Sequence, residues 1–216
     1  MTTPMDLPYE KVAYPDAPWQ MVGSMWLTVF RLGHDARGAD GTPRPRGVYG
    51  AAFVSYEEGS PLTYSELLVA RALPKSDGKG RKVSITDIWV DSPASVAGGR
   101  ELWAIPKGLC DFELETSHRG PLSRTECSAS FGRSPIASAT FRDVSRAAPR
   151  LPFKGTTWQP ELPEGGGEKG AVLQGSSKAF VARASWDFAA DGPLGFMRGA
   201  RQLASFRQAD FRMSFG

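Results

Sequence analysis

Lys107 is the side chain in this sequence best suited to covalent chemistry. It lies in the stretch ELWAIPKGLCDF, where Pro106 fixes one backbone angle beside it and its neighbours include Trp103, Ile105 and Leu109. A lysine among apolar groups loses solvation of its charged form, so its pKa is expected to fall. The neutral amine attacks a carbonyl carbon and forms a Schiff base, which is an electron sink for loss of CO2, aldol cleavage or dehydration.

A surface role is the alternative for Lys107. Its ammonium would then lie in water while its stem covers Trp103 or Phe112. Residue chemistry alone favours this alternative, because a single lysine is a weak signal.

Glu66 and Tyr64 are the next candidates. With a period of two, one face of residues 61–73 carries Leu62, Tyr64, Glu66, Leu68 and Ala70. A carboxylate on such a face would orient or deprotonate a group near an amine in the same cavity. The alternatives are an ion pair with Arg71 or Arg100, or an outward position on a helix. Tyr64 would donate a hydrogen bond to a substrate or belong to the core.

Other chemistry finds little support in the sequence. It contains no nucleophile elbow, phosphate loop, dinucleotide fingerprint or HExxH motif. Cys110 and Cys127 form neither a disulfide framework nor a metal motif, and His34 and His118 lie far apart. We therefore expect no metal and no cofactor. Trp103 is a core residue or a ligand contact, and Arg100 pins a helix to the sheet or binds substrate.

The elements that would position these residues are mostly strands. Residues 19–32, 47–57 and 81–92 read as strands, and residues 122–144 as a hairpin that turns near Gly132 to Pro135. Ser92 followed by Pro93 is typical of a helix start, which predicts a short helix over residues 94–103. A second short helix is predicted near residues 196–205, before a last strand. The pattern predicts a single domain, 1–216, that is mainly β (α+β): an antiparallel barrel or curled sheet with a few short helices.

Charge and hydropathy exclude two classes of partner. The net charge of +3 is small and scattered, and the densest basic run, residues 75–82, reads as a solvated turn, so no nucleic acid is expected. The N-terminus has no signal pattern and no apolar run approaches membrane-spanning length. These features predict a cytoplasmic protein without a membrane partner.

Together these pieces resemble the acetoacetate decarboxylase family. The resemblance rests on TYSELLVA (residues 63–70) and on VSITDIWVDSPASVAGGRELWAIPKGL (residues 83–109), with its order of strand, short helix ending in Gly-Arg-Glu, spacer and Pro-Lys. It implies a cone-shaped, mostly antiparallel β barrel, with Lys107 as the Schiff-base lysine and Glu66 as an active-site glutamate. It also implies a homo-oligomer and a small-molecule carbonyl substrate. Acetoacetate decarboxylase is a known example of an enzyme whose lysine is activated by desolvation or by a neighbouring cation.

Three small residues replace polar groups of the family pattern. Gly108 stands where the decarboxylases have a second lysine, Gly23 where they have an early arginine, and Ala51 near a second acidic residue. These replacements predict a larger, more apolar cavity that lacks an obvious partner for a substrate carboxylate. The expected substrate-binding set is Tyr64, Arg100, Trp103, Gly23, Ala51 and Gly108.

Three functions follow from these residues. The first is a Schiff-base lyase that acts on a β-keto acid or related carbonyl compound through Lys107, with Glu66 as acid, base or orienting group. The second uses the same lysine for aldol, dehydration or cyclisation chemistry on a bulkier carbonyl substrate. The third is a non-catalytic barrel that binds an apolar small molecule.

Overall fold

The computed structural model describes residues 12–74, 82–144 and 148–216, most of which belong to one curled, largely antiparallel sheet of 11 strands. The strands of this sheet are β1 (Trp19–Leu32), β4 (Gly47–Tyr56), β5 (Tyr64–Ala72), β6 (Lys82–Val90), β7 (Lys107–Leu109), β8 (Asp111–Arg119), β9 (Leu122–Phe131), β10 (Ser134–Val144), β11 (Arg150–Gln159), β12 (Lys169–Phe188) and β13 (Arg201–Phe215). Two short strands, β2 (Ala36–Arg37) and β3 (Pro43–Arg44), pair separately. The expected mainly β, curled-sheet class is confirmed.

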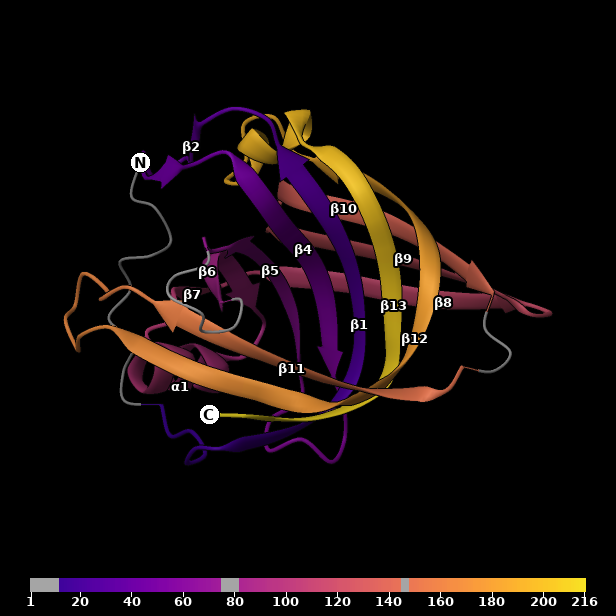
Figure 1. Ribbon diagram of the computed structural model, residues 1–216, viewed down its shortest axis with the longest axis horizontal. Coiled ribbons are helices and arrows are strands. Elements are labelled where there is room, and N and C mark those ends of the chain that lie inside the picture. The colour runs from indigo at the N-terminus through magenta and orange to yellow at the C-terminus, as the bar shows by residue number, and fades with distance from the viewer. Residues whose placement is uncertain (1–11, 75–81, 145–147) are drawn as a thin grey trace.

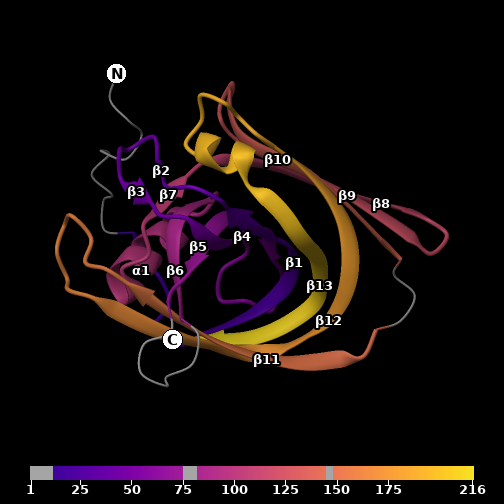
Figure 2. The same cartoon turned by 45° about the horizontal axis from the view of Figure 1, so that its top comes forward.

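Seven strands curl round a common interior. Their order is β6-β5-β4-β1-β13-β12-β11, and β11 returns to β6 through two parallel residue pairs, Thr156 with Lys82 and Thr157 with Val83. Figures 1 and 2 show β4, β1, β13 and β12 bending round this interior, with β11 crossing beneath it. Residues 182–188 of β12 pair with β10, and the sheet continues through β9 and β8. This end of β12 forms a second layer together with β10, β9 and β8.

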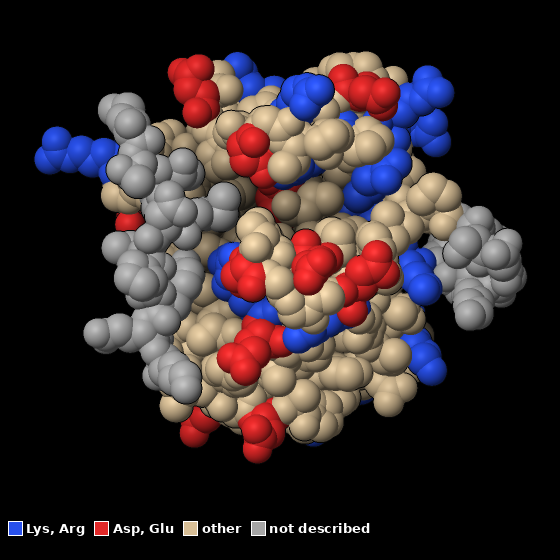
Figure 3. Space-filling model, turned by 90° about the vertical axis from the view of Figure 1, so that its left-hand side faces the viewer, with Lys and Arg blue, Asp and Glu red and all other residues tan. Residues whose placement is uncertain are grey.

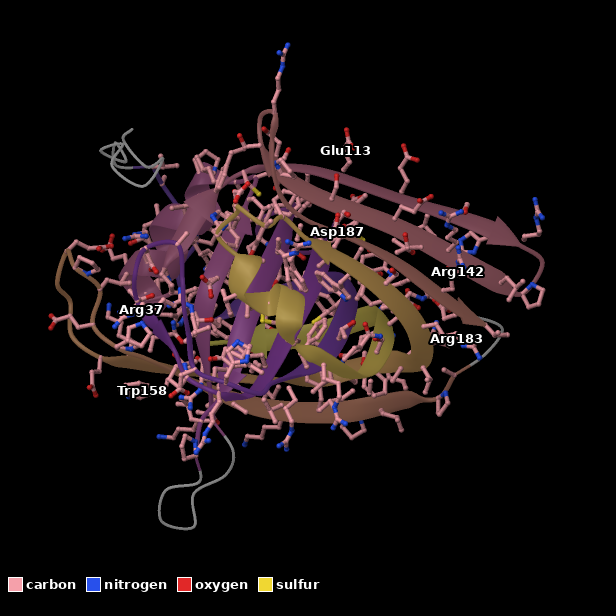
Figure 4. The ribbon with its side chains drawn as sticks, turned by 90° about the horizontal axis from the view of Figure 1, so that it is seen from above. Arg37, Glu113, Arg142, Trp158, Arg183 and Asp187 are labelled. Atoms are coloured by element: carbon pink, nitrogen blue, oxygen red, sulfur yellow. The ribbon has the colours of Figure 1, made fainter. Side chains whose placement is uncertain are left out.

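The two faces of β1, β4 and β5 have different neighbours, because side chains alternate along a strand. One face points into the curl. The other packs on the second layer, where Phe53 stacks on Trp186 with ring centroids 5.3 Å apart and Phe141 meets the same tryptophan edge-on. Charged residues of the second layer, among them Glu113, Arg142 and Asp187, are exposed on its other side (Figure 4).

Helix α1 (Pro93–Trp103) connects β6 to β7. As predicted, Ser92 caps its N-terminus by accepting a hydrogen bond from the Ser95 backbone N–H, and Pro93 occupies the first turn. At the other end Ala104 adopts a left-handed conformation (φ 54°), and its N–H and that of Ile105 return to carbonyls of the last turn. This tight ending turns the chain directly into β7, which begins at Lys107.

Most predicted elements are confirmed, and one is corrected. The strands expected at residues 19–32 and 47–57 and the hairpin turn at residues 132–135 are present. Of the strand expected over residues 81–92, β6 covers residues 82–90, and residue 81 lies outside the described residues. The helix expected over residues 196–205 is a short 3-10 turn, η1 (Gly195–Gly199), and β13 already begins at Arg201. Ala204 pairs with Val29 of β1, and Ser205 pairs with Ala182 of β12. Pairing on both sides therefore overrides the local helical pattern.

The surface charge and the length of the helices relate to the expectation that neither nucleic acid nor a membrane is a partner. Figure 3 shows acidic and basic side chains interspersed on the face that it presents. Within the part of the chain that the structure describes, no helix has the length and hydropathy needed to cross a membrane. Residues 75–81 of the basic run lie outside the described residues.

Candidate functional site

A cavity of about 370 Å³ occupies the interior of the curl. Its walls come from β1, β4, β5, β6, β11, β12 and β13, with α1 and the start of β7 at one end. Most of the lining side chains are apolar: they include Met21, Met25, Leu27, Val29, Ala52, Val54, Leu68, Ala70, Ala72, Val83, Ile85, Ile88, Trp103, Ile105, Leu173, Phe211, Met213 and Phe215. The size lies within the range of about 300–1,000 Å³ that is usual for small-molecule sites.

Lys107 projects into this cavity because of its register in β7. It pairs with Ile88 of the parallel strand β6, and both residues line the cavity. Gly99 of α1 makes room for the lysine stem: a Cβ at this glycine would lie 2.7 Å from Lys107 Cδ. The side chain is thus held between the helix and the sheet, and Lys107 is only 4% exposed. The surface alternative for Lys107 is therefore wrong.

Three side chains contact the Lys107 ammonium. Its Nζ donates hydrogen bonds to Glu66 Oε2 at 2.9 Å, to Ser95 Oγ at 2.9 Å and to Tyr64 Oη at 3.3 Å. All three are buried, with Glu66 3% exposed. An ammonium has three donors, so this set satisfies all of them.

Glu66 is held from its other side by a tyrosine. Tyr56 Oη donates to Glu66 Oε1 at 3.0 Å, so each carboxylate oxygen has one side-chain donor. Tyr56 and Tyr64 are register partners on β4 and β5, and their ring centroids lie 4.4 Å apart. Cross-strand pairing therefore places both hydroxyls on the same carboxylate–ammonium pair.

The charge state of Lys107 differs from the expectation. Burial lowers the pKa of Lys107, but the adjacent Glu66 carboxylate and the Tyr64 hydroxyl raise it by more, so the pKa lies above its ordinary value. The predicted fall is wrong for the resting site, because the sequence-based argument counted burial without the carboxylate. Burial also raises the pKa of both Tyr56 and Tyr64, which therefore remain protonated donors.

The arrangement provides an amine together with its proton acceptor. Lys107 becomes nucleophilic only after it loses a proton, and Glu66 Oε2, at 2.9 Å, lies within direct proton-transfer distance. The same carboxyl group can then return that proton to a carbonyl oxygen as it leaves. Glu66 is thereby suited to act as both base and acid for an attack by Lys107.

The predicted substrate-binding residues divide into two groups. Tyr64 and Trp103 line the cavity, where Trp103 packs against Trp19 with ring centroids 4.8 Å apart. Arg100 does not line it: its guanidinium pairs with Glu164 at 2.6 Å and donates to the Lys107 carbonyl at 3.1 Å. Arg100 is therefore a positioning residue for the lysine backbone.

The three small residues also lie outside the cavity lining. A Cβ at Gly23 would lie 2.0 Å from the Ser55 carbonyl oxygen, beside a register shift in β1, so this glycine permits a close approach of two strands. Ala51 is fully buried between the two layers. A Cβ at Gly108 would meet the Trp89 ring at 3.2 Å. The expectation that these residues widen the cavity is corrected.

Sequence reasoning missed Ser95 and Tyr56. Ser95 lies in the first turn of α1, where the capping pattern of Ser92 and Pro93 explained the segment without a second role. Tyr56 ends the strand whose partner carries Tyr64. Its signal was the pairing of β4 with β5, which the sequence alone does not reveal.

No cysteine is among the described residues that line the cavity. Cys110 is buried, and its burial raises the pKa of its thiol to about 12, so it stays a protonated thiol. No group of three or more His, Cys, Asp or Glu side chains within ranges 12–74, 82–144 and 148–216 is placed to hold a metal ion.

One family model and several solved structures match this chain. The family model described as acetoacetate decarboxylase matches residues 42–162, which include Glu66 and Lys107. An acetoacetate decarboxylase structure superposes with a TM-score of 0.61 at 14% identity and covers 95% of this chain and 89% of that one. The acetoacetate decarboxylase of Legionella pneumophila gives 0.58 at 13% identity, with 98% and 90% covered.

A structure of the enduracididine biosynthesis enzyme MppR in complex with pyruvate gives a TM-score of 0.56 at 14% identity, with 95% of this chain and 90% of that chain covered. At such identities the structural likeness shows the fold. No curated protein matches the chain in sequence.

Proposed function

The chain belongs to the acetoacetate decarboxylase family, and on that premise we propose that it is a lyase that forms a Schiff base with a carbonyl compound through Lys107. The observation that carries the proposal is the contact of a buried lysine with a buried carboxylate, 2.9 Å apart, at the end of an apolar cavity. In this proposal Lys107 is the nucleophile and Glu66 transfers protons.

The covalent step balances from the charged resting pair. The ammonium gives one proton to Glu66, the free amine attacks the carbonyl carbon, and the carbonyl oxygen takes up two protons and leaves as water. The product is a protonated imine, so the positive charge beside Glu66 is kept. The two tyrosine hydroxyls and Ser95 hold the pair in place during this exchange.

Two outcomes of the imine are compatible with the site. A β-keto acid would lose CO2 from the imine, as the family resemblance implies. The alternative is carbon–carbon bond cleavage or formation of the aldol type, in which the same carboxyl group handles the hydroxyl proton. Among solved structures with this fold, one is of MppR with the condensation product of pyruvate and imidazole 4-carboxaldehyde bound.

Reductive trapping tests the proposal. The protein is incubated with a carbonyl compound and borohydride, and the peptide that contains Lys107 is examined by mass spectrometry for the reduced adduct. We expect an adduct on Lys107 in the wild type and none in Lys107→Ala. Lys178→Ala, which removes an exposed lysine, is the matched control and should keep the adduct. If wild type and Lys107→Ala give the same labelling, the Schiff-base function is wrong.

A further inference from the structure

The cavity has one polar end and a long apolar remainder. Its buried end holds Tyr56, Tyr64, Glu66 and Lys107, whose polar atoms contact one another. The hydroxyl of Thr157, on another wall, already donates to the Ala171 carbonyl. The hydroxyl of Tyr49, also in the lining, donates to the Pro45 carbonyl. Elsewhere the described lining residues are glycine or carry aliphatic, aromatic or thioether side chains.

Strand β5 shows the change from polar to apolar lining along the residues of one face. From Glu66 the lining continues with Leu68, Ala70 and Ala72, so the side chains become apolar and then small. Glu66 is buried, whereas the last three are half-buried, which places the opening at their end. Six residues of strand span about 20 Å. A ligand that reaches Lys107 from this opening therefore passes along an extended apolar wall.

The charge of the cavity is balanced before any substrate binds. Lys107 is the only Lys or Arg among the described residues that line it, and Glu66 is the only Asp or Glu. The protonated imine keeps the same balance when the substrate is uncharged. A substrate carboxylate would add one uncompensated negative charge beside Glu66, in surroundings where an unpaired charge is costly.

We infer that the substrate of this site is an uncharged ketone or aldehyde with a hydrocarbon arm, whose carbonyl group meets Lys107 while the arm lies along Leu68, Ala70 and Ala72. The inference rests on the proposed Schiff-base function and narrows it. It also selects among the reactions, because a substrate without a carboxylate cannot lose CO2.

Aldol, dehydration and cyclisation chemistry remain, and aldol cleavage is the one that the paired lysine and carboxylate serve most directly. In an uncharged β-hydroxy ketone bound as the imine, Glu66 takes the hydroxyl proton and the bond between the α and β carbons breaks. Its electron pair moves into the imine to give a neutral enamine, and the β carbon leaves as an aldehyde. Protonation at the α carbon and hydrolysis then release the shorter ketone and restore the lysine. No oxidant, reductant or cofactor is needed.

Four probes test the inference in pairs. Acetone and 2-nonanone differ in the arm, while acetoacetate and 3-oxodecanoate are the same two ketones with a carboxylate added. The measurement is the concentration that gives half-maximal borohydride trapping on Lys107. Each buried methylene strengthens binding about fourfold, so we expect 2-nonanone to trap at a concentration at least about 100-fold lower than acetone. The carboxylate should weaken trapping at either arm length.

The outcomes separate the inference from the function on which it rests. Tighter trapping of acetoacetate than of acetone, or release of CO2 from either keto acid on a Lys107-dependent basis, overturns the inference and leaves the Schiff-base function standing. Equal trapping of acetone and 2-nonanone also overturns it. If none of the four compounds labels Lys107, both the function and the inference fail.

Two variants test which residues set the preference for a long arm and the discrimination against a carboxylate. Ala70→Trp fills the apolar wall, so it should remove the advantage of 2-nonanone over acetone. Leu68→Arg adds a cation near Lys107 and should reverse the discrimination against the carboxylate, whereas the matched variant Leu68→Met should not. Thermal unfolding identifies a variant that has lost its fold. Retention of the 2-nonanone advantage in folded Ala70→Trp would contradict the proposed position of the arm.

Discussion

The protein has two buried ion pairs whose acidic residues lie on the neighbouring strands β5 and β6, and the two pairs differ in whether their cation can give up a proton. Lys107 and Glu66 meet in the cavity, and Arg44 and Asp87 meet outside its lining, with Asp87 next to the cavity residue Ile88 in β6. All four residues of the two pairs are at most 8% exposed. Burial and pairing alone therefore do not distinguish the pair that we propose to be catalytic from a pair that only holds segments together.

The geometry of the partners makes the difference. Arg44 approaches Asp87 with two nitrogens, Nε at 3.1 Å and Nη2 at 2.7 Å, and its guanidinium lies over the Phe196 ring at 5.6 Å. This two-point contact fixes the β2–β3 segment on β6, and a guanidinium does not lose its proton in proteins. Lys107 makes a single contact with Glu66 and carries a proton that it can transfer.

The largest effect on stability is expected for the arginine pair. Asp87→Asn leaves Arg44 buried and charged without its carboxylate, which should lower the free energy of unfolding by about 3 kcal/mol. Chemical denaturation measures the change. Asp40→Asn is the control, because Asp40 is 3.7 Å from Arg44 and its side chain is 38% exposed, and it should cost less than about 1 kcal/mol. Equal losses in the two variants would contradict the structural role of the buried pair.

In the cavity pair, replacing the carboxylate by an amide should change the pKa of Lys107. Glu66→Gln removes the charge that raises the pKa of Lys107 and leaves burial, which lowers it, so the pKa of Lys107 should fall. The pH dependence of Lys107 acylation by an uncharged reagent measures it. An unchanged or higher midpoint in Glu66→Gln would show that Glu66 does not raise the pKa of Lys107.

The alkaline behaviour of the wild type gives a smaller effect. Because the folded pKa of Lys107 lies above the unfolded value of about 10.4, its pairing stabilises the protein fully below that pH and less as pH rises through the folded pKa. The stability difference between wild type and Lys107→Met should therefore shrink by up to about 1.4 kcal/mol per pH unit in this window. Denaturation at a series of alkaline pH values checks it, and a constant difference would speak against the charged pair.

The smallest effect is expected for the tyrosine behind Glu66. Tyr56→Phe removes one hydrogen bond to Glu66 and should cost about 1 kcal/mol, while slowing imine trapping by about tenfold or less. The matched variant Tyr49→Phe removes a hydroxyl that donates a hydrogen bond to the Pro45 carbonyl and does not contact Glu66 or Lys107. It should cost a similar stability and leave trapping unchanged. Equal trapping rates in both variants would show that Tyr56 does not position the carboxylate.

Local patterns in the sequence were sufficient for most elements and for the face that Tyr64 and Glu66 share, but for Lys107 they favoured the surface alternative, which is wrong. The period of two in residues 61–73 placed Tyr64 and Glu66 on one face, and Ser92 with Pro93 marked the start of α1. These predictions succeeded because strand alternation and helix capping depend on neighbours in the chain. The family resemblance joined Glu66 to Lys107, which local rules alone did not.

The tertiary structure decided what depends on residues far apart in the chain. Lys107 and Glu66 are separated by 41 positions, and their contact reverses the direction in which burial alone would move the lysine pKa. Sheet register brought Tyr56 to the carboxylate, and the packing of two layers kept Ala51 out of the cavity. The sequence by itself determined which groups are available and on which face of their element they lie. Only the curl of the sheet decided which of them share one enclosed space, because electrostatic interaction and desolvation depend on distance in space.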